Sequence, residues 1–78
     1  MSHVPHELPD EFPEFVEKMQ KLKQDDAHFA RLADDYHEVN REIHRIETDV
    51  TPTSDEYHEG LRKKRMRLKD EIFHILNA

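Results

Sequence analysis

Apolar side chains recur every seven residues through much of the chain. A second apolar series, Leu32, Val39 and Ile46, lies three positions after members of the first. This spacing puts both series on one face of an α-helix. The pattern therefore predicts one long helix over about residues 12–49. The members of the first series are Phe15, Leu22, Phe29, Tyr36, Ile43 and Val50.

Prolines set the limits of this helix. Three of them, the last being Pro13, come close together at the start of the chain. Proline interrupts a helix except in its first turn, so we expect residues 1–11 to be a disordered, proline-rich lead. Pro52 and the hydroxyl residues around it stop the helix at its other end. A turn over residues 50–53 is predicted there.

A second helix is predicted over about residues 54–76. Thr53, with a glutamate three residues later, forms a capping-box pattern at its start. Leu61, Leu68 and Ile75 then repeat seven residues apart, which indicates one apolar face. This second helix is shorter than the first.

The two predicted helices fold back on each other in one register. In an antiparallel pair, facing residues have position numbers with a constant sum, and one sum places Ile43 opposite Leu61 and Leu32 opposite Ile72. A connection of a few residues is the usual length. The predicted fold is therefore all-α: an antiparallel two-helix coiled-coil hairpin over residues 12–76. Periodicity alone also permits an extended helix that pairs with another chain.

The first part of the longer helix has no partner in this register. Residues 12–24 would extend beyond the second helix by roughly 20 Å at 1.5 Å per residue. Large apolar patches are rarely left in water, and an isolated helix pair is marginally stable. We therefore expect assembly into a homodimer, approaching a four-helix bundle as two hairpins pack together, or into a tetramer, with a surface also open to another protein. The predicted oligomer or partner interface consists of Phe12, Phe15, Val16, Met19 and Leu22.

Composition narrows the classes of function. The 78 residues include no Cys and one Gly, which excludes disulfide frameworks, thiolate zinc sites, cysteine nucleophiles and glycine-rich phosphate loops. Ser2 and Ser54 are the serines, and neither suggests a catalytic nucleophile. No apolar run approaches the length of a membrane span. We expect a cytoplasmic, non-enzymatic interaction module with no cofactor and no membrane association.

A basic run offers an alternative function. Six bases occupy the eight positions from Arg62 to Lys69, in a chain whose net charge is −6. A nucleic-acid contact through Arg62, Lys63, Arg67 and Lys69 is the alternative reading. At 100° per residue, however, the six charges surround the helix, and the opposite helix is acidic. We therefore favour a solvated, cross-paired flank and expect no nucleic-acid partner.

Four histidines have a spacing found in metal-binding helical bundles, but their expected positions do not favour a metal site. His28, His37, His58 and His74 each follow an acid by three residues, the spacing of Glu-x-x-His ligands in metal-binding bundles. Such ligands point into a bundle core, whereas His28, His37 and His74 lie beside the apolar face or outside it. Surface pairs between neighbouring turns are the expected arrangement, and no metal site is predicted.

Five segments carry a further pattern: Phe12-Pro13-Glu14-Phe15, Lys21-Leu22-Lys23, Asp26-Ala27-His28-Phe29-Ala30-Arg31-Leu32, Asp35-Tyr36-His37-Glu38-Val39-Asn40 and Leu61-Arg62-Lys63-Lys64-Arg65-Met66-Arg67-Leu68-Lys69-Asp70-Glu71-Ile72. In this order they resemble the YdcH-like family of small bacterial proteins over about residues 12–76. The resemblance implies a short coiled-coil hairpin in the bacterial cytoplasm, of unknown function and without catalytic residues to carry over. Ala33 departs from the family, whose members tend to have a large apolar residue there.

Overall fold

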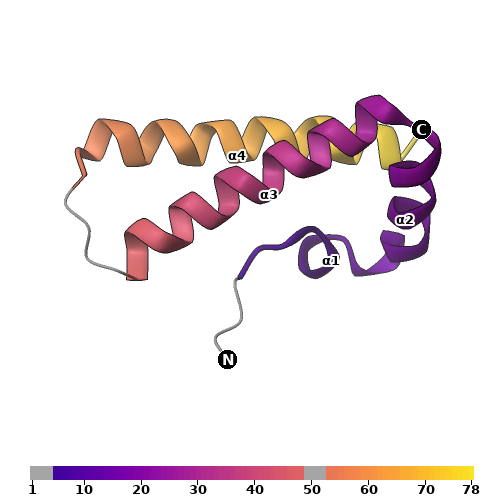
Figure 1. The fold of residues 1–78 in the computed structure, drawn as a ribbon, viewed down its shortest axis with the longest axis horizontal. Helices are drawn as coiled ribbons and strands as arrows, with labels where there is room; N and C mark the ends of the chain where they lie inside the picture. Colours follow the sequence, from indigo (N-terminus) through magenta and orange to yellow (C-terminus); the bar gives the residue numbers. More distant parts are fainter. Residues whose placement is uncertain (1–4, 49–52) are drawn as a thin grey trace.

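The structure, a computed structural model, describes residues 5–48 and 53–78, and every element in these ranges is helical (Figure 1). α3 and α4 run antiparallel and pack as a hairpin, which confirms the predicted all-α hairpin. The predicted turn lies outside the described residues, apart from Thr53. The elements are α1 (Leu8–Glu11), the short 3-10 helix η1 (Pro13–Phe15), α2 (Val16–Asp25), α3 (Ala27–Thr48) and α4 (Asp55–Leu76).

The first predicted helix is divided at Asp26. Its backbone there is extended, and its carboxylate accepts hydrogen bonds that cap the start of α3. α3 and α4 are each 22 residues long. The prediction of one continuous helix over residues 12–49, longer than the second, is therefore wrong. An aspartate cap outweighs the continuous apolar period at this position.

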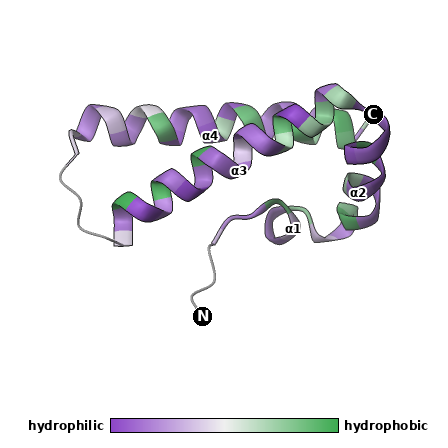
Figure 2. Ribbon diagram, in the orientation of Figure 1, coloured by the Kyte–Doolittle hydropathy of each residue, from purple (hydrophilic) through white to green (hydrophobic). Residues whose placement is uncertain are grey.

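The core lies between α3 and α4 and is completed by residues from before Asp26. Phe29, Tyr36 and Ile72 are fully buried, and apolar residues recur along both helices among a majority of hydrophilic ones (Figure 2). Arg65 of α4 donates a hydrogen bond to Asn40 of α3, next to Val39, which the predicted antiparallel register places opposite Arg65. The hairpin register is thus close to the predicted one.

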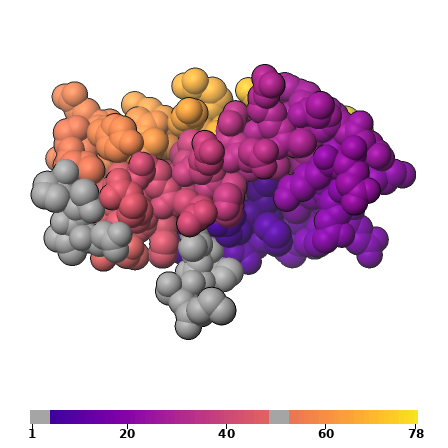
Figure 3. All heavy atoms as spheres, in the orientation of Figure 1, coloured from indigo at the N-terminus to yellow at the C-terminus, as the bar shows by residue number. Residues whose placement is uncertain are grey.

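Residues 5–25, here called the N-terminal segment, fold against the hairpin. α1 lies beside α3, and α2 runs across the end of the hairpin where α4 ends (Figure 1). Leu8 is buried, so the expectation of a disordered lead is wrong from Pro5 onward, while residues 1–4 lie outside the described part of the chain. The chain measures 39 × 28 × 18 Å, and the segment packs directly on α3 in the space-filling view (Figure 3).

The start of α4 is capped by Ser54 and not by Thr53. The N–H of Tyr57 donates to the Ser54 hydroxyl oxygen at 3.1 Å. A capping side chain accepts from the N–H group three residues after it. Because α4 begins at Asp55, the residue in the capping position is Ser54. The predicted capping box is therefore wrong, because the third residue after Ser54 is Tyr57, which has no carboxylate to complete the box.

Candidate interaction surface

The five residues predicted to form an exposed interface are packed within the chain. Phe12 and Met19 are only 6% and 4% exposed. Phe15, Val16 and Leu22 are half-buried and pack against the same core. The predicted overhang does not exist, because the chain turns at Asp26 and α2 folds over the hairpin instead of projecting beyond it.

The hairpin offers a docking face to the N-terminal segment, defined here by the side chains of Tyr36, Asn40, Lys69 and Phe73. Two of these side chains come from α3 and two from α4. All four contact residues that precede Asp26. This face is therefore the part of the hairpin on which the N-terminal segment docks.

Phe12 provides the apolar part of this contact. Its ring stacks on the ring of Phe73, with centroids 5.7 Å apart and planes inclined by 15°. The ring of Phe15 meets it edge-on at 6.4 Å. Lys69 Nζ lies 5.9 Å from the Phe12 centroid, a cation–π distance, and pairs with Glu11 Oε1 at 3.1 Å. The stack on Phe73 and the ion pair with Lys69 thus hold two adjacent residues of the N-terminal segment, Phe12 and Glu11.

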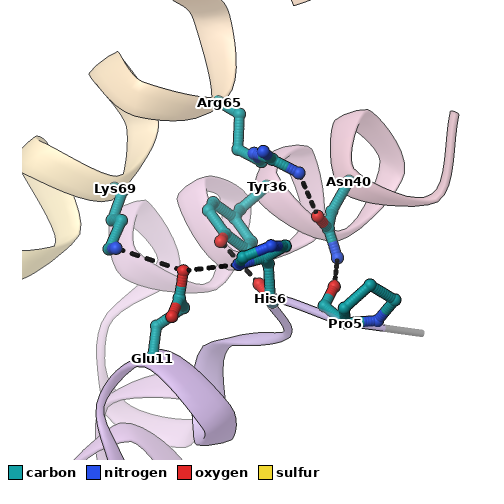
Figure 4. Close-up of polar contacts among 7 residues, drawn as sticks. All are labelled: Pro5, His6, Glu11, Tyr36, Asn40, Arg65 and Lys69. Carbon is teal, nitrogen blue, oxygen red and sulfur yellow. Dashed lines mark hydrogen bonds and ion pairs between the residues drawn. The ribbon is translucent and has the colours of Figure 1, made fainter. Parts of the chain in front are cut away.

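Two side chains of α3 hold the backbone of the segment. The Tyr36 hydroxyl donates to the His6 carbonyl at 2.6 Å, and Asn40 Nδ2 donates to the Pro5 carbonyl at 2.8 Å (Figure 4). Asn40 Oδ1 in turn accepts from Arg65 at 2.9 Å. Asn40 is 1% exposed, and its amide is satisfied on both sides. These bonds hold His6 at φ 65°, a left-handed conformation that histidine adopts more readily than most residues.

The electrostatics of the docking face follow from burial and close pairs. Burial, with the negative charge of Glu11 nearby, raises the pKa of Tyr36 to about 12. Burial alone would also raise the pKa of Glu11, but hydrogen bonds from Lys69 and His6 outweigh it and hold that pKa below its usual value of 4.5. Glu11 is therefore an anion at neutral pH and keeps its pair with Lys69.

Some bases of the basic run are paired with acidic residues within the chain, and others are exposed. Arg62 pairs with Glu47 at 2.7 Å, and this hydrogen bond lowers the pKa of the Glu47 carboxyl. Lys69 is directed toward Glu11. Lys63 and Arg67 are exposed. Two of the four residues predicted as nucleic-acid contacts are therefore engaged in ion pairs within the chain.

The histidines of the described ranges lie at the surface of the fold or near it. His28 and His74 line an open hollow of about 420 Å³ together with Asp70, Glu71 and Ile75. His37 Nδ1 lies 3.1 Å from Glu7. Across residues 5–48 and 53–78, no group of three or more His, Cys, Asp or Glu side chains is placed to hold a metal. No helix in these ranges is long and apolar enough to cross a membrane.

Sequence reasoning missed Tyr36 and Asn40 as docking residues. Tyr36 was predicted to lie in the core, and it does. The sequence pattern did not indicate which group would accept a hydrogen bond from its hydroxyl. A signal existed for Asn40: the predicted register places the basic Arg65 in an otherwise apolar seam, opposite Val39 and so one position from Asn40. Two polar residues side by side in an apolar seam indicate a polar partner, which is the Pro5 carbonyl.

A family model described as "Protein of unknown function (DUF465)" matches residues 29–76, more than half of the chain. The chain belongs to this family, which confirms its resemblance to the YdcH-like small helical proteins. The match begins in the first turn of α3 and ends at the last residue of α4, so it covers the hairpin and leaves the N-terminal segment outside. No curated protein and no solved structure matches the chain.

Proposed function

We propose that this DUF465 protein is a non-enzymatic protein-interaction module that assembles with a second copy of itself. The observation that carries the proposal is the docking face, which takes up a short amphipathic segment and buries Leu8, Phe12 and Met19 against the hairpin. Helix faces that receive such a segment are a recurrent means of protein recognition. The segment that fits this face is present in every copy of the chain.

Charge supports the pairing of like copies through this face. Glu11 of the segment meets Lys69 of the hairpin at 3.1 Å, and Lys18 donates to the Leu76 carbonyl at the end of α4 at 2.6 Å. A cation at the carboxyl end of a helix is favourable because that end carries partial negative charge. The segment and the face are therefore complementary in charge as well as in apolar area.

Sedimentation equilibrium of the intact chain over a wide concentration range tests this function. We expect the average mass to rise reversibly with concentration, from monomer toward dimer. Phe12→Ala should weaken association, because without its anchor on Phe73 the segment is left undocked from any hairpin, its own or that of another copy. A chain that remains monomeric at every concentration would contradict self-association.

Met66 provides a matched control. It is 63% exposed and stands on α4 outside the docking face. Met66→Gln should leave association at the wild-type level. If this substitution abolishes the dimer instead, another face of α4 carries the assembly and the proposed role of the docking face is wrong.

A further inference from the structure

A single residue, Asp26, joins α2 to α3. Its backbone has φ −129° and ψ 104°, and its N–H donates to the Leu22 carbonyl at 2.8 Å, which ends α2. Its carboxylate accepts from the N–H groups of His28 and Phe29 at 3.0 and 3.2 Å, which caps α3. The change of direction between the two helices therefore depends on the backbone of one residue.

The sequence on both sides of Asp26 is compatible with an unbroken helix. Residues 14–51 contain neither glycine nor proline, and the seven-residue apolar series passes from Leu22 to Phe29 without a shift. With helical dihedral angles at Asp26, residues 16–48 would form one helix about 50 Å long at 1.5 Å per residue. Such a helix would exceed the 39 Å length of the folded chain and would move α2 off the end of the hairpin.

The contacts that hold the N-terminal segment join residues on opposite sides of Asp26. Glu11 pairs with Lys69, and Lys18 donates to the Leu76 carbonyl, in each case across 58 positions of sequence. These groups meet without any covalent link, so the geometry is the same whether the two partners belong to one chain or to two. A second copy, opened at the same residue, reproduces the full set.

We propose that Asp26 is the hinge of a domain swap, in which α2 and α3 join into one helix and residues 5–25 of each copy dock on the hairpin of the other. The swap rests on the proposed self-association and gives its mechanism. Exchange of an identical element is a low-cost route to a dimer, because the docking contacts already exist in the monomer. The monomer is favoured in dilute solution, where association costs translational freedom, and the dimer grows with concentration.

Substitutions at the hinge residue test this mechanism. Asp26→Ala removes the cap that favours the closed chain and places the strongest helix former at the junction. We expect it to tighten dimerisation by roughly ten-fold or more, since each dimer contains two hinges. Asp26→Asn is the matched control, because asparagine caps a helix about as well as aspartate, and its dimer should stay close to wild type.

Ala27→Pro should favour the closed monomer over the swapped dimer. Ala27 is the first residue of α3 and is exposed, and proline is favoured at that position of a helix. Proline also keeps the preceding residue in the extended conformation that Asp26 already has. Within a joined helix the same proline would remove a backbone hydrogen bond and clash with the preceding turn. The dimer should weaken by at least about 100-fold.

A cross-link between two different variants detects the exchange directly. The chain has no cysteine, so Glu11→Cys in one copy and Lys69→Cys in another create two unique thiols at side chains that meet at 3.1 Å. The two variants are mixed, incubated at high concentration and treated with a short bismaleimide. A product that joins one chain of each kind is expected, and adding Ala27→Pro to both variants should abolish it.

The outcomes separate the swap from self-association itself. If Ala27→Pro dimerises as well as wild type and the mixed cross-link is absent, the copies associate without opening and through another surface, so the swap is wrong while self-association stands. If wild type and Asp26→Ala are both monomeric at every concentration, both proposals fail. A tighter Asp26→Ala dimer together with the mixed cross-link establishes the hinge.

Discussion

Asn40 connects three parts of the molecule through one side-chain amide. It stands on α3, donates to the Pro5 carbonyl and accepts from Arg65 of α4. An amide at 1% exposure is tolerated because both of its ends are paired. The sequence identified the apolar face around this position, but the partner carbonyl lies 35 positions away. No local pattern encodes a contact over that distance.

Asn40→Ala should lower the free energy of unfolding by about 3 kcal/mol, because it leaves the Pro5 carbonyl and the Arg65 guanidinium without this partner. Tyr36→Phe is the comparison, since it removes one hydrogen bond, to His6, and keeps the buried ring. It should cost only about 1 kcal/mol. Urea unfolding followed by circular dichroism measures both. Equal losses in the two variants would argue against the double role of Asn40.

The Tyr36 hydroxyl also makes stability dependent on alkaline pH. Its pKa is raised from 10.0 to about 12 in the folded chain, so the fold favours the neutral phenol. This contribution is fully present below pH 10 and is lost as the pH rises toward 12. In Tyr57→Phe, Tyr36 is the remaining tyrosine. Phenolate absorbance should have its midpoint near 12 in the folded chain and near 10 in urea, and a midpoint near 10 in both would contradict the assignment.

At the scale of elements, the hairpin could be predicted and the division at Asp26 could not. The hairpin follows from two apolar faces separated by Pro52, both strong signals in the sequence. At Asp26 the first apolar series continues from Leu22 to Phe29, although Asp25 and Lys18 replace the second series upstream, and no glycine or proline lies nearby. The break depends on an aspartate cap and on the packing of residues 5–25 against α4. At this position the local apolar pattern favours a continuous helix, whereas tertiary packing favours a break, and the structure has the break.

The cap of α4 gives a prediction at the same scale. Ser54→Ala should destabilise the fold by about 1 kcal/mol, because the Tyr57 N–H loses its acceptor. Thr53→Ala is the matched control and should change the midpoint of thermal unfolding very little, since α4 begins after Ser54. A larger effect at Thr53 than at Ser54 would restore the capping box expected from the sequence.

At the scale of the whole molecule, apolar residues before Asp26 complete a core that the hairpin alone leaves thin. The sequence correctly marked Phe12, Phe15, Val16, Met19 and Leu22 as residues in need of a partner. It assigned them to a second chain because a straight first helix left them no surface of their own. The turn at Asp26 provides that surface within the chain.

A double-mutant cycle at Phe12 and Phe73 measures how strongly the segment is coupled to the hairpin. Phe12→Ala should cost about 3–5 kcal/mol as a buried aromatic side chain. Phe73 is 43% exposed, so Phe73→Ala should cost less. The coupling between them should be about 0.5–1.5 kcal/mol, as for stacked aromatic pairs. Additive losses in chemical denaturation would mean that the two rings do not stabilise one another.

The span of the docking contacts along the chain has a consequence for the order of folding. Contacts within the hairpin, such as Arg62 with Glu47, close loops of 15 positions, whereas the ties to the N-terminal segment from Lys69 and Leu76 close loops of 58. Shorter loops close sooner, so the hairpin forms first and the segment is added to it. In native-state hydrogen exchange, amides of α2 should open at lower free energy than those at the centre of α3. The segment is thus the last part to become native and the first to leave.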